Sequence, residues 1–155
     1  MKKNLLILSI TLFLFSSCKK PETLVPVESD ILFKNWYYKT RTKTDFTPGQ
    51  PPKTNTPIVF NGYDYISFSK HGYTGEYQRT SKSGVTLLHS LHYSYHAEIS
   101  DKGENVGSLM IYYKKGPAFY EIKALNETTL RLVQRIYTDH GTTKVAEIET
   151  VYTSK

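Results

Sequence analysis

Residues 85–100 read VTLLHSLHYSYHAEIS, and this stretch decides the fold. Its side chains alternate with a period of two, which is the pattern of a β-strand with one packed face and one solvated face. One face carries Leu87, His89, Leu91, Tyr93, Tyr95, Ala97 and Ile99, and the other carries Ser90, His92, Ser94, His96 and Glu98.

The same alternation recurs along most of the chain. The sequence contains 13 Tyr and 7 Phe, and aromatic residues favour pleated, half-buried surfaces. Glycine-containing and polar segments separate the alternating stretches and predict turns. The longest irregular segment is Thr44–Pro57, which we expect to be a loop. The expected strands are 35–43, 63–69, 73–79, 85–100, 108–114, 118–125, 129–137 and 142–153.

Short connections make sequential strands antiparallel neighbours. Eight such strands with long free edges would aggregate unless the sheet closed on itself. We therefore predict an all-β, eight-stranded antiparallel up-and-down barrel, with a two-sheet β-sandwich as the alternative.

The N-terminus has the organisation of a secretory signal. Lys2 and Lys3 precede an apolar run from Leu5 to Phe15, which as a helix would be roughly 16 Å long. That is too short for a hydrocarbon core of ~30 Å. The flanks fit a cleaved signal peptide instead.

The motif Phe15-Ser16-Ser17-Cys18 resembles the lipobox of bacterial lipoproteins, which implies lipid attachment at Cys18. We expect a signal peptide at 1–17, a lipid-anchored tether at 18–29 and a β-barrel domain at 30–155. The expected location is the outer membrane, on its periplasmic face rather than the cell surface. The alternatives are an uncleaved apolar anchor or a plain signal.

Charge and cysteine content exclude several classes. The net charge of +6 falls to +4 without Lys2 and Lys3, less than a nucleic-acid-binding surface needs. Cys18 is the only cysteine, so neither an internal disulfide nor a cysteine-based metal motif can form.

Residues 32–36, 64–77 and 120–132 are similar to segments of lipocalin-like domains of bacterial envelope lipoproteins. Leu32-Phe33-Lys34-Asn35-Trp36 resembles their Leu-x-Gly-x-Trp opening, and 64–77 and 120–132 resemble two of their hairpins. The resemblance implies that Trp36 plugs the closed end of the barrel. It also implies that a small ligand could occupy the interior.

Tyrosines are the best candidates for ligand contact, because each combines an apolar ring with a hydroxyl. An eight-stranded barrel can also be filled by its own side chains, so packed core and ligand pocket both remain open. The candidate ligand-binding residues on the expected inner face are Tyr38, Phe68, Tyr93, Tyr95, Tyr120 and Gln134.

The histidines at 89, 92 and 96 suggest a metal site at first sight. On a strand, His89 points away from His92 and His96, which lie about 13 Å apart, too far to share one ion. Only a cross-strand ligand, with Glu98 as a neighbour, would rescue a metal or enzymatic interpretation. We expect no enzyme, no metal and no cofactor.

Two non-catalytic functions remain. The first is a binding module for a small apolar or amphipathic ligand in the barrel. The second is an envelope scaffold that binds a protein or glycan through residues 44–57 and exposed tyrosines. The stripe Lys39, Arg41 and Lys43 is expected on a solvated face, with contact to acidic lipid or glycan as the alternative.

Overall fold

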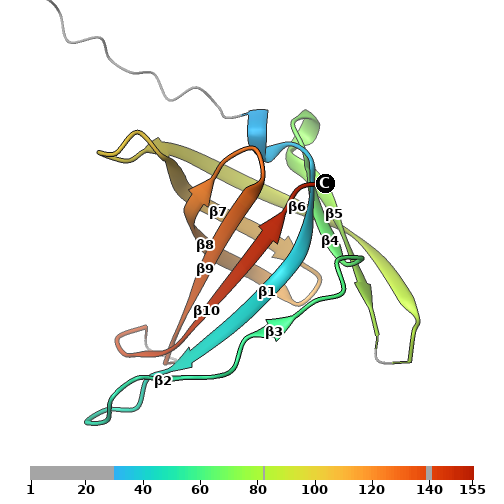
Figure 1. Ribbon diagram of the computed structural model, residues 1–155. Coiled ribbons are helices and arrows are strands. Elements are labelled where there is room, and N and C mark those ends of the chain that lie inside the picture. Colours follow the sequence, from blue (N-terminus) through green and yellow to red (C-terminus); the bar gives the residue numbers. More distant parts are fainter. Residues whose placement is uncertain (1–29, 82, 139–140) are drawn as a thin grey trace, which may run out of the picture.

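Eight antiparallel strands close into a barrel, as the sequence predicts (Figure 1). The structure is a computed structural model, and it describes residues 30–155 except 82, 139 and 140. Two short strands and two 3₁₀ turns complete the described chain. The barrel strands are β1 (Asn35–Asp45), β4 (Tyr65–Ser69), β5 (Thr74–Thr80), β6 (Thr86–Ile99), β7 (Asn105–Tyr113), β8 (Gly116–Leu125), β9 (Thr129–Tyr137) and β10 (Lys144–Thr153); the additional elements are β2 (Lys53–Thr54), β3 (Ile58–Val59), η1 (Asp30–Leu32) and η2 (His71–Tyr73).

The barrel closes where its first strand meets its last. β1 and β10 pair antiparallel from Tyr37 opposite Thr153 to Asp45 opposite Ala146. The other barrel strands pair in chain order from β4 to β10, and β4 returns to β1. Because β1 and β10 satisfy each other's backbone groups, neither is left as a free edge.

Trp36 plugs one end of the barrel. Its side chain is fully buried, and its Nε1 donates a hydrogen bond to the carbonyl oxygen of Leu32 at 2.9 Å. The ammonium of Lys34 lies 4.8 Å from the indole centroid and donates to the carbonyl oxygen of Glu127 at 2.6 Å. η1 and the β8–β9 turn are thereby joined over the indole, and we call this the closed end. The core around it comprises Leu32, Trp36, Ile66, Phe68, Leu91, Tyr93, Leu109, Ile111, Ile122, Leu125, Leu130, Leu132 and Tyr152.

Gly75 allows the close approach of β4 and β5. A Cβ at this position would lie 2.1 Å from the carbonyl oxygen of Ser67, on the neighbouring strand. No side chain fits at that distance, so the residue that faces buried Leu91 across the β5–β6 pair must be glycine.

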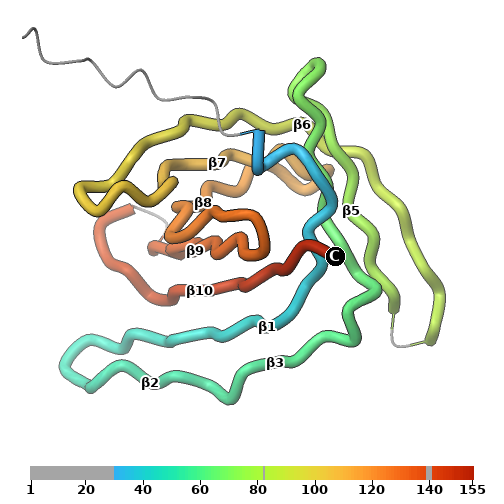
Figure 2. Tube along the Cα trace, turned by 45° about the horizontal axis from the view of Figure 1, so that its top comes forward, coloured from blue at the N-terminus to red at the C-terminus, as the bar shows by residue number. Residues whose placement is uncertain are grey.

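The segment predicted as a loop at 44–57 is partly ordered. β1 continues through Thr44 and Asp45, which pair with Thr54 and Lys53 of β2. β3 follows and pairs with β1, so β2, β3 and β4 lie in succession along one edge of β1 (Figure 2). The sequence did not predict these two-residue strands, because they lie among turn-forming residues. They are recognised only by their pairing with β1.

Lys39, Arg41 and Lys43 were expected to share one solvated face of β1. This expectation is wrong, because Arg41 and Lys43 lie on the other face of the strand. Tyr38 pairs with Tyr152, but Thr40 pairs with Val151, so one additional residue is inserted in β1. Such a β-bulge reverses the alternation of faces beyond it. Arg41 therefore lies opposite Thr150, whose side chain is buried on the inner face of β10.

The expected signal peptide at 1–17, the lipid-bearing Cys18 and the tether at 18–29 lie outside the described residues. Among the residues that are described, no helix has the length and apolar character needed to cross a bilayer.

Replacing Trp36 by alanine should lower the free energy of unfolding by about 3–5 kcal/mol, because it removes a buried indole and leaves a cavity. Urea unfolding followed by circular dichroism measures the change. The control is Asn35→Ala, an exposed position on the same strand, which should change stability by less than about 0.5 kcal/mol. A loss below about 1 kcal/mol for Trp36→Ala would show that the indole does not hold the closed end together.

Candidate functional site

The strand directions define an open end opposite Trp36. Because neighbouring strands are antiparallel, the ends of β1, β5, β7 and β9 meet the starts of β6, β8 and β10 there. Toward the open end, past the start of β4, the strand next to β1 on that edge is β3, which pairs with β1 and not with β5. The β5–β6 hairpin diverges from β3 in both views (Figures 1 and 2). Side chains at this end have fewer neighbours than those around Trp36.

A layer of tyrosines lies on the side of the core that faces the open end, and one of them, Tyr152, is itself part of the core. We call this layer the tyrosine floor, and it consists of Tyr38, Tyr77, Tyr113, Tyr120 and Tyr152. The rings of Tyr38 and Tyr152 lie 4.6 Å apart, and those of Tyr77 and Tyr113 lie 5.3 Å apart. The hydroxyls of Tyr113 and Tyr120 are within 3.4 Å. Five strands therefore contribute to this layer, in which Tyr38 contacts Tyr152 and Tyr113 contacts both Tyr77 and Tyr120.

Three phenols of the floor have raised pKa values. Burial raises the pKa of Tyr113 and of Tyr152, and nearby phenols add to the shift. Burial also raises the pKa of Tyr38, although a hydrogen bond with Tyr152 and the charges of Arg79 and Arg41 oppose it. The floor therefore offers a ligand neutral hydroxyls and ring faces.

Beyond the floor, inner-face side chains remain open to solvent. Leu87 of β6 shares the face of buried Leu91 and Tyr93, yet it is 49% exposed. Ile58 lies opposite Arg41 and is 59% exposed. His89 is exposed as well, and its ring stacks on Tyr77 at 4.8 Å. An inward-facing side chain that stays exposed shows that the interior is accessible at this end.

The six candidate residues from the sequence all face inward, but at different depths. Tyr38 and Tyr120 belong to the tyrosine floor, and Gln134 lies on the inner face of β9 opposite Ile148. Tyr95 is half-buried opposite buried Leu109. Their role in ligand contact stays a prediction.

Phe68 and Tyr93 instead occupy the closed-end core. Their rings pack edge to face at 5.0 Å, and both side chains are buried. The Tyr93 hydroxyl donates to the carbonyl oxygen of Ser69 at 2.7 Å. These two side chains therefore belong to the buried core and lie away from the open end.

Sequence reasoning missed three tyrosines of the floor and two inner-face arginines nearer the open end. These residues are Tyr77, Tyr113, Tyr152, Arg79 and Arg41. Tyr77 and Arg79 had a detectable signal, because they alternate with Gly75 along an expected strand. Arg41 had none, since its facing depends on a bulge that only the pairing with β10 reveals.

His92 and His96 lie on the outer face of β6, away from His89, as the alternation predicts. His96 Nε2 is 3.5 Å from a carboxylate oxygen of Glu98. No group of three metal-ligating side chains occurs in the part of the chain that the structure describes.

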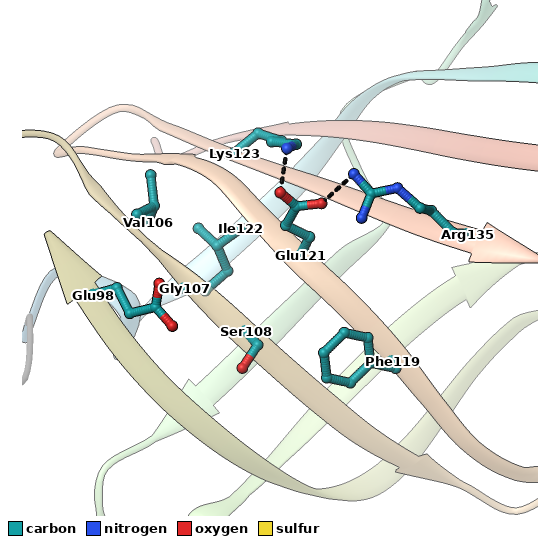
Figure 3. A pocket seen from close by; sticks show the side chains of 9 residues that line it. All are labelled: Glu98, Val106, Gly107, Ser108, Phe119, Glu121, Ile122, Lys123 and Arg135. Carbon is teal, nitrogen blue, oxygen red and sulfur yellow. Dashed lines mark hydrogen bonds and ion pairs between the residues drawn. The ribbon is translucent and has the colours of Figure 1, made fainter. Parts of the chain in front are cut away.

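A groove of about 420 Å³ lies between β6, β7, β8 and β9 (Figure 3). Three of its four charged residues bind one another: Glu121 accepts from Lys123, and Arg135 lies 2.5 Å from the same carboxylate. Burial acts to raise the pKa of Glu121, but these two cations outweigh it and lower the pKa. The groove therefore presents ion-paired side chains beside exposed Phe119. None of the tyrosines of the floor lines it.

The alternative interface at residues 44–57 is accessible. Residues 47–57 are exposed throughout, including β2. Tyr63, in the connection to β4, is 67% exposed. Binding of a protein or glycan there stays a prediction.

Two solved structures share this fold. A lipocalin-like protein from Bacteroides uniformis aligns with a TM-score of 0.50 and 13% identity, over 81% of this chain and 99% of that protein. Lobster apocrustacyanin A1 aligns with a TM-score of 0.50 and 14% identity, over 83% of this chain and 63% of its own. No family model and no curated protein matches the sequence. The fold is lipocalin-like.

Alkaline pH should destabilise the folded protein. A hydrogen bond to Glu76 at 2.6 Å raises the pKa of Tyr65 to about 12, and burial raises those of Tyr38, Tyr113 and Tyr152. Tyrosines of the unfolded chain ionise near pH ~10. Because the folded state holds these protons longer, its extra stability is present below pH ~10 and is lost as the pH rises toward ~12.

Absorbance at 295 nm measures the phenolates. Part of the signal should appear only above pH ~11 in the folded protein, and the whole signal should be complete near pH ~11 in urea. Tyr65→Phe should remove a share of the late phase. Identical titration curves for the folded and unfolded protein would refute the neutral floor.

Proposed function

We propose that this protein is a non-catalytic binding module that holds a small apolar or amphipathic molecule at the open end of its barrel. The observation that carries the proposal is the combination of a neutral tyrosine floor with inward-facing apolar side chains that remain exposed above it. Leu87 and Ile58 are the clearest of these side chains.

The packing of the barrel supports entry from one end. The closed end is filled by Trp36 and its neighbours, so a ligand could approach only from the side of Leu87 and His89. Contact with the ligand would remove apolar surface from water, which favours binding by roughly 25 cal/mol per Å². Phenolic hydroxyls of the floor could receive a polar group on the same molecule.

The proposed role requires no reaction step. The residues around the open end are phenols with raised pKa values, aliphatic side chains and arginines, which supply contacts and charge rather than an activated nucleophile. His89 is engaged in stacking on Tyr77.

We further propose that a lipid on Cys18 tethers the barrel to the outer membrane, on its periplasmic face. The support comes from the lipobox-like motif at 15–18. η1 begins at Asp30 beside the closed end, so a tether through residues 18–29 would attach the barrel by that end. The open end would then be free to receive a ligand.

Introducing a charge on the inner face should abolish ligand binding. Leu87→Asp is expected to weaken binding of the neutral fluorescent probe N-phenyl-1-naphthylamine at least tenfold, because an apolar body would meet a carboxylate. The matched control is Leu88→Asp: this neighbour is 60% exposed but faces outward. Fluorescence titration gives both affinities. Failure of the native protein to bind the probe, or equal losses in the two variants, would overturn the proposal.

Cys18→Ser should move the protein from the membrane fraction to the soluble fraction of a bacterial host. Stable attachment needs two or more acyl chains, so removal of their attachment point releases the protein. Metabolic labelling with palmitate and fractionation measure the change. Ser17→Ala, next to the same cleavage position, is the control and should leave the label in place. Label retained by Cys18→Ser would disprove the lipid anchor.

A further inference from the structure

Arg41 is placed on the inner face by the bulge in β1. It lies opposite Thr150 of β10, which is only 6% exposed, and opposite Ile58 of β3. Thr40 and Thr42 on either side pair with Val151 and Glu149 of the outer face. Arg41 therefore projects to the same side of the sheet as Tyr38, nearer the open end.

Arg79 reaches the same region from the other side. In the β5–β6 pair, Arg79 lies opposite Leu87. Every second residue of β5 shares a face, so Arg79 is on the same face as Tyr77 and as Gly75, which lies opposite buried Leu91. The side chain of Arg79 is therefore on the inner face. β3 and β5 are not paired with each other, so the two arginines flank the side on which the barrel wall is interrupted.

Neither guanidinium forms an ion pair with any other described residue. The nearby inner-face acid, Asp45, is engaged by Lys43 at 2.6 Å and by the amide of Asn55 at 3.3 Å. Glu147 and Glu149 lie on the outer face of β10, where arginines of β9 bind them. The buried carboxylate of Asp64, just before β4, accepts a hydrogen bond from the backbone N–H of Thr80, the residue after Arg79, at 2.8 Å. Neither Asp45 nor Asp64 forms an ion pair with Arg41 or Arg79.

Both arginines also act on the tyrosine floor. Their charges oppose the effect of burial on the pKa of Tyr38, which belongs to the floor. A cation beside an apolar, hydroxyl-bearing surface is the complement of a molecule that carries a negative head on an apolar body. Arginine suits a carboxylate head because its planar fork can donate two parallel hydrogen bonds.

We infer that Arg41 and Arg79 form an anion subsite at the open end, and that the ligand is an amphipathic carboxylate whose apolar part contacts Leu87, Ile58 and the tyrosine floor. This inference rests on the proposed binding function and specifies the chemical class of the ligand.

The test compares two ligands of equal length that differ in head-group charge. Decanoate and decanol each displace N-phenyl-1-naphthylamine from the full domain at pH 8, and fluorescence gives both affinities. Decanoate should bind at least tenfold more tightly than decanol. In Arg41→Gln/Arg79→Gln this preference should fall to less than threefold, with decanol affinity unchanged. Arg41→Lys/Arg79→Lys should retain part of the preference.

The matched control removes two charges from the same end without altering the inner face. Lys114 and Lys115 are exposed in the turn between β7 and β8, so Lys114→Gln/Lys115→Gln should keep the full preference for decanoate. A measurement on the native protein needs no variant: decanoate affinity should fall between 0.05 and 0.5 M salt while decanol affinity does not.

Equal binding of decanoate and decanol to the native protein, with the probe still bound, would overturn the anion subsite and leave the binding module intact. An equal loss of the preference for decanoate in Arg41→Gln/Arg79→Gln and in Lys114→Gln/Lys115→Gln would also overturn the anion subsite, because the preference would then reflect net charge. Absence of binding by the probe and by both ligands would overturn the proposed function itself.

Discussion

The ladder between β1 and β10 is the constraint on which the rest of the structure depends. These strands are the first and last of the barrel, more than a hundred residues apart along the chain, and they pair over almost their whole length. Closure removes both free edges and creates an inside. Without it, the inner faces of the strands would be one side of an open sheet, and neither a buried Trp36 nor a tyrosine floor could exist.

The interior divides into two regions with different physical character. Around Trp36 the side chains are buried and make one continuous core, which the 3₁₀ turn η1 covers. Toward the other end, inner-face side chains such as Leu87 remain exposed. The buried phenols between these regions are costly to ionise, so they form a neutral boundary. Buried side chains lie below this boundary and accessible inner-face side chains lie above it.

The β-bulge after Tyr38 links the fold to the chemistry of the open end. A single inserted residue reverses which side chains of β1 face inward. It brings a guanidinium into an interior that would otherwise receive Thr40 and Thr42. The pairing of Lys43 with Asp45 neutralises the next charge along the strand, so the reversal leaves Arg41 as a distinct feature. Bulges can re-aim a side chain in this way without any other change in the sheet.

The sequence by itself determined the class of fold, the order of the strands and most of their faces, because period-two alternation is a local property of each strand. Residues 85–100 show this most clearly, and Tyr120 was placed inward from the same pattern. Only the tertiary structure decided the facing of Arg41, the short pairings of β2 and β3, and the depth of Phe68 and Tyr93. These depend on which residue lies opposite on another strand, and no single strand carries that information.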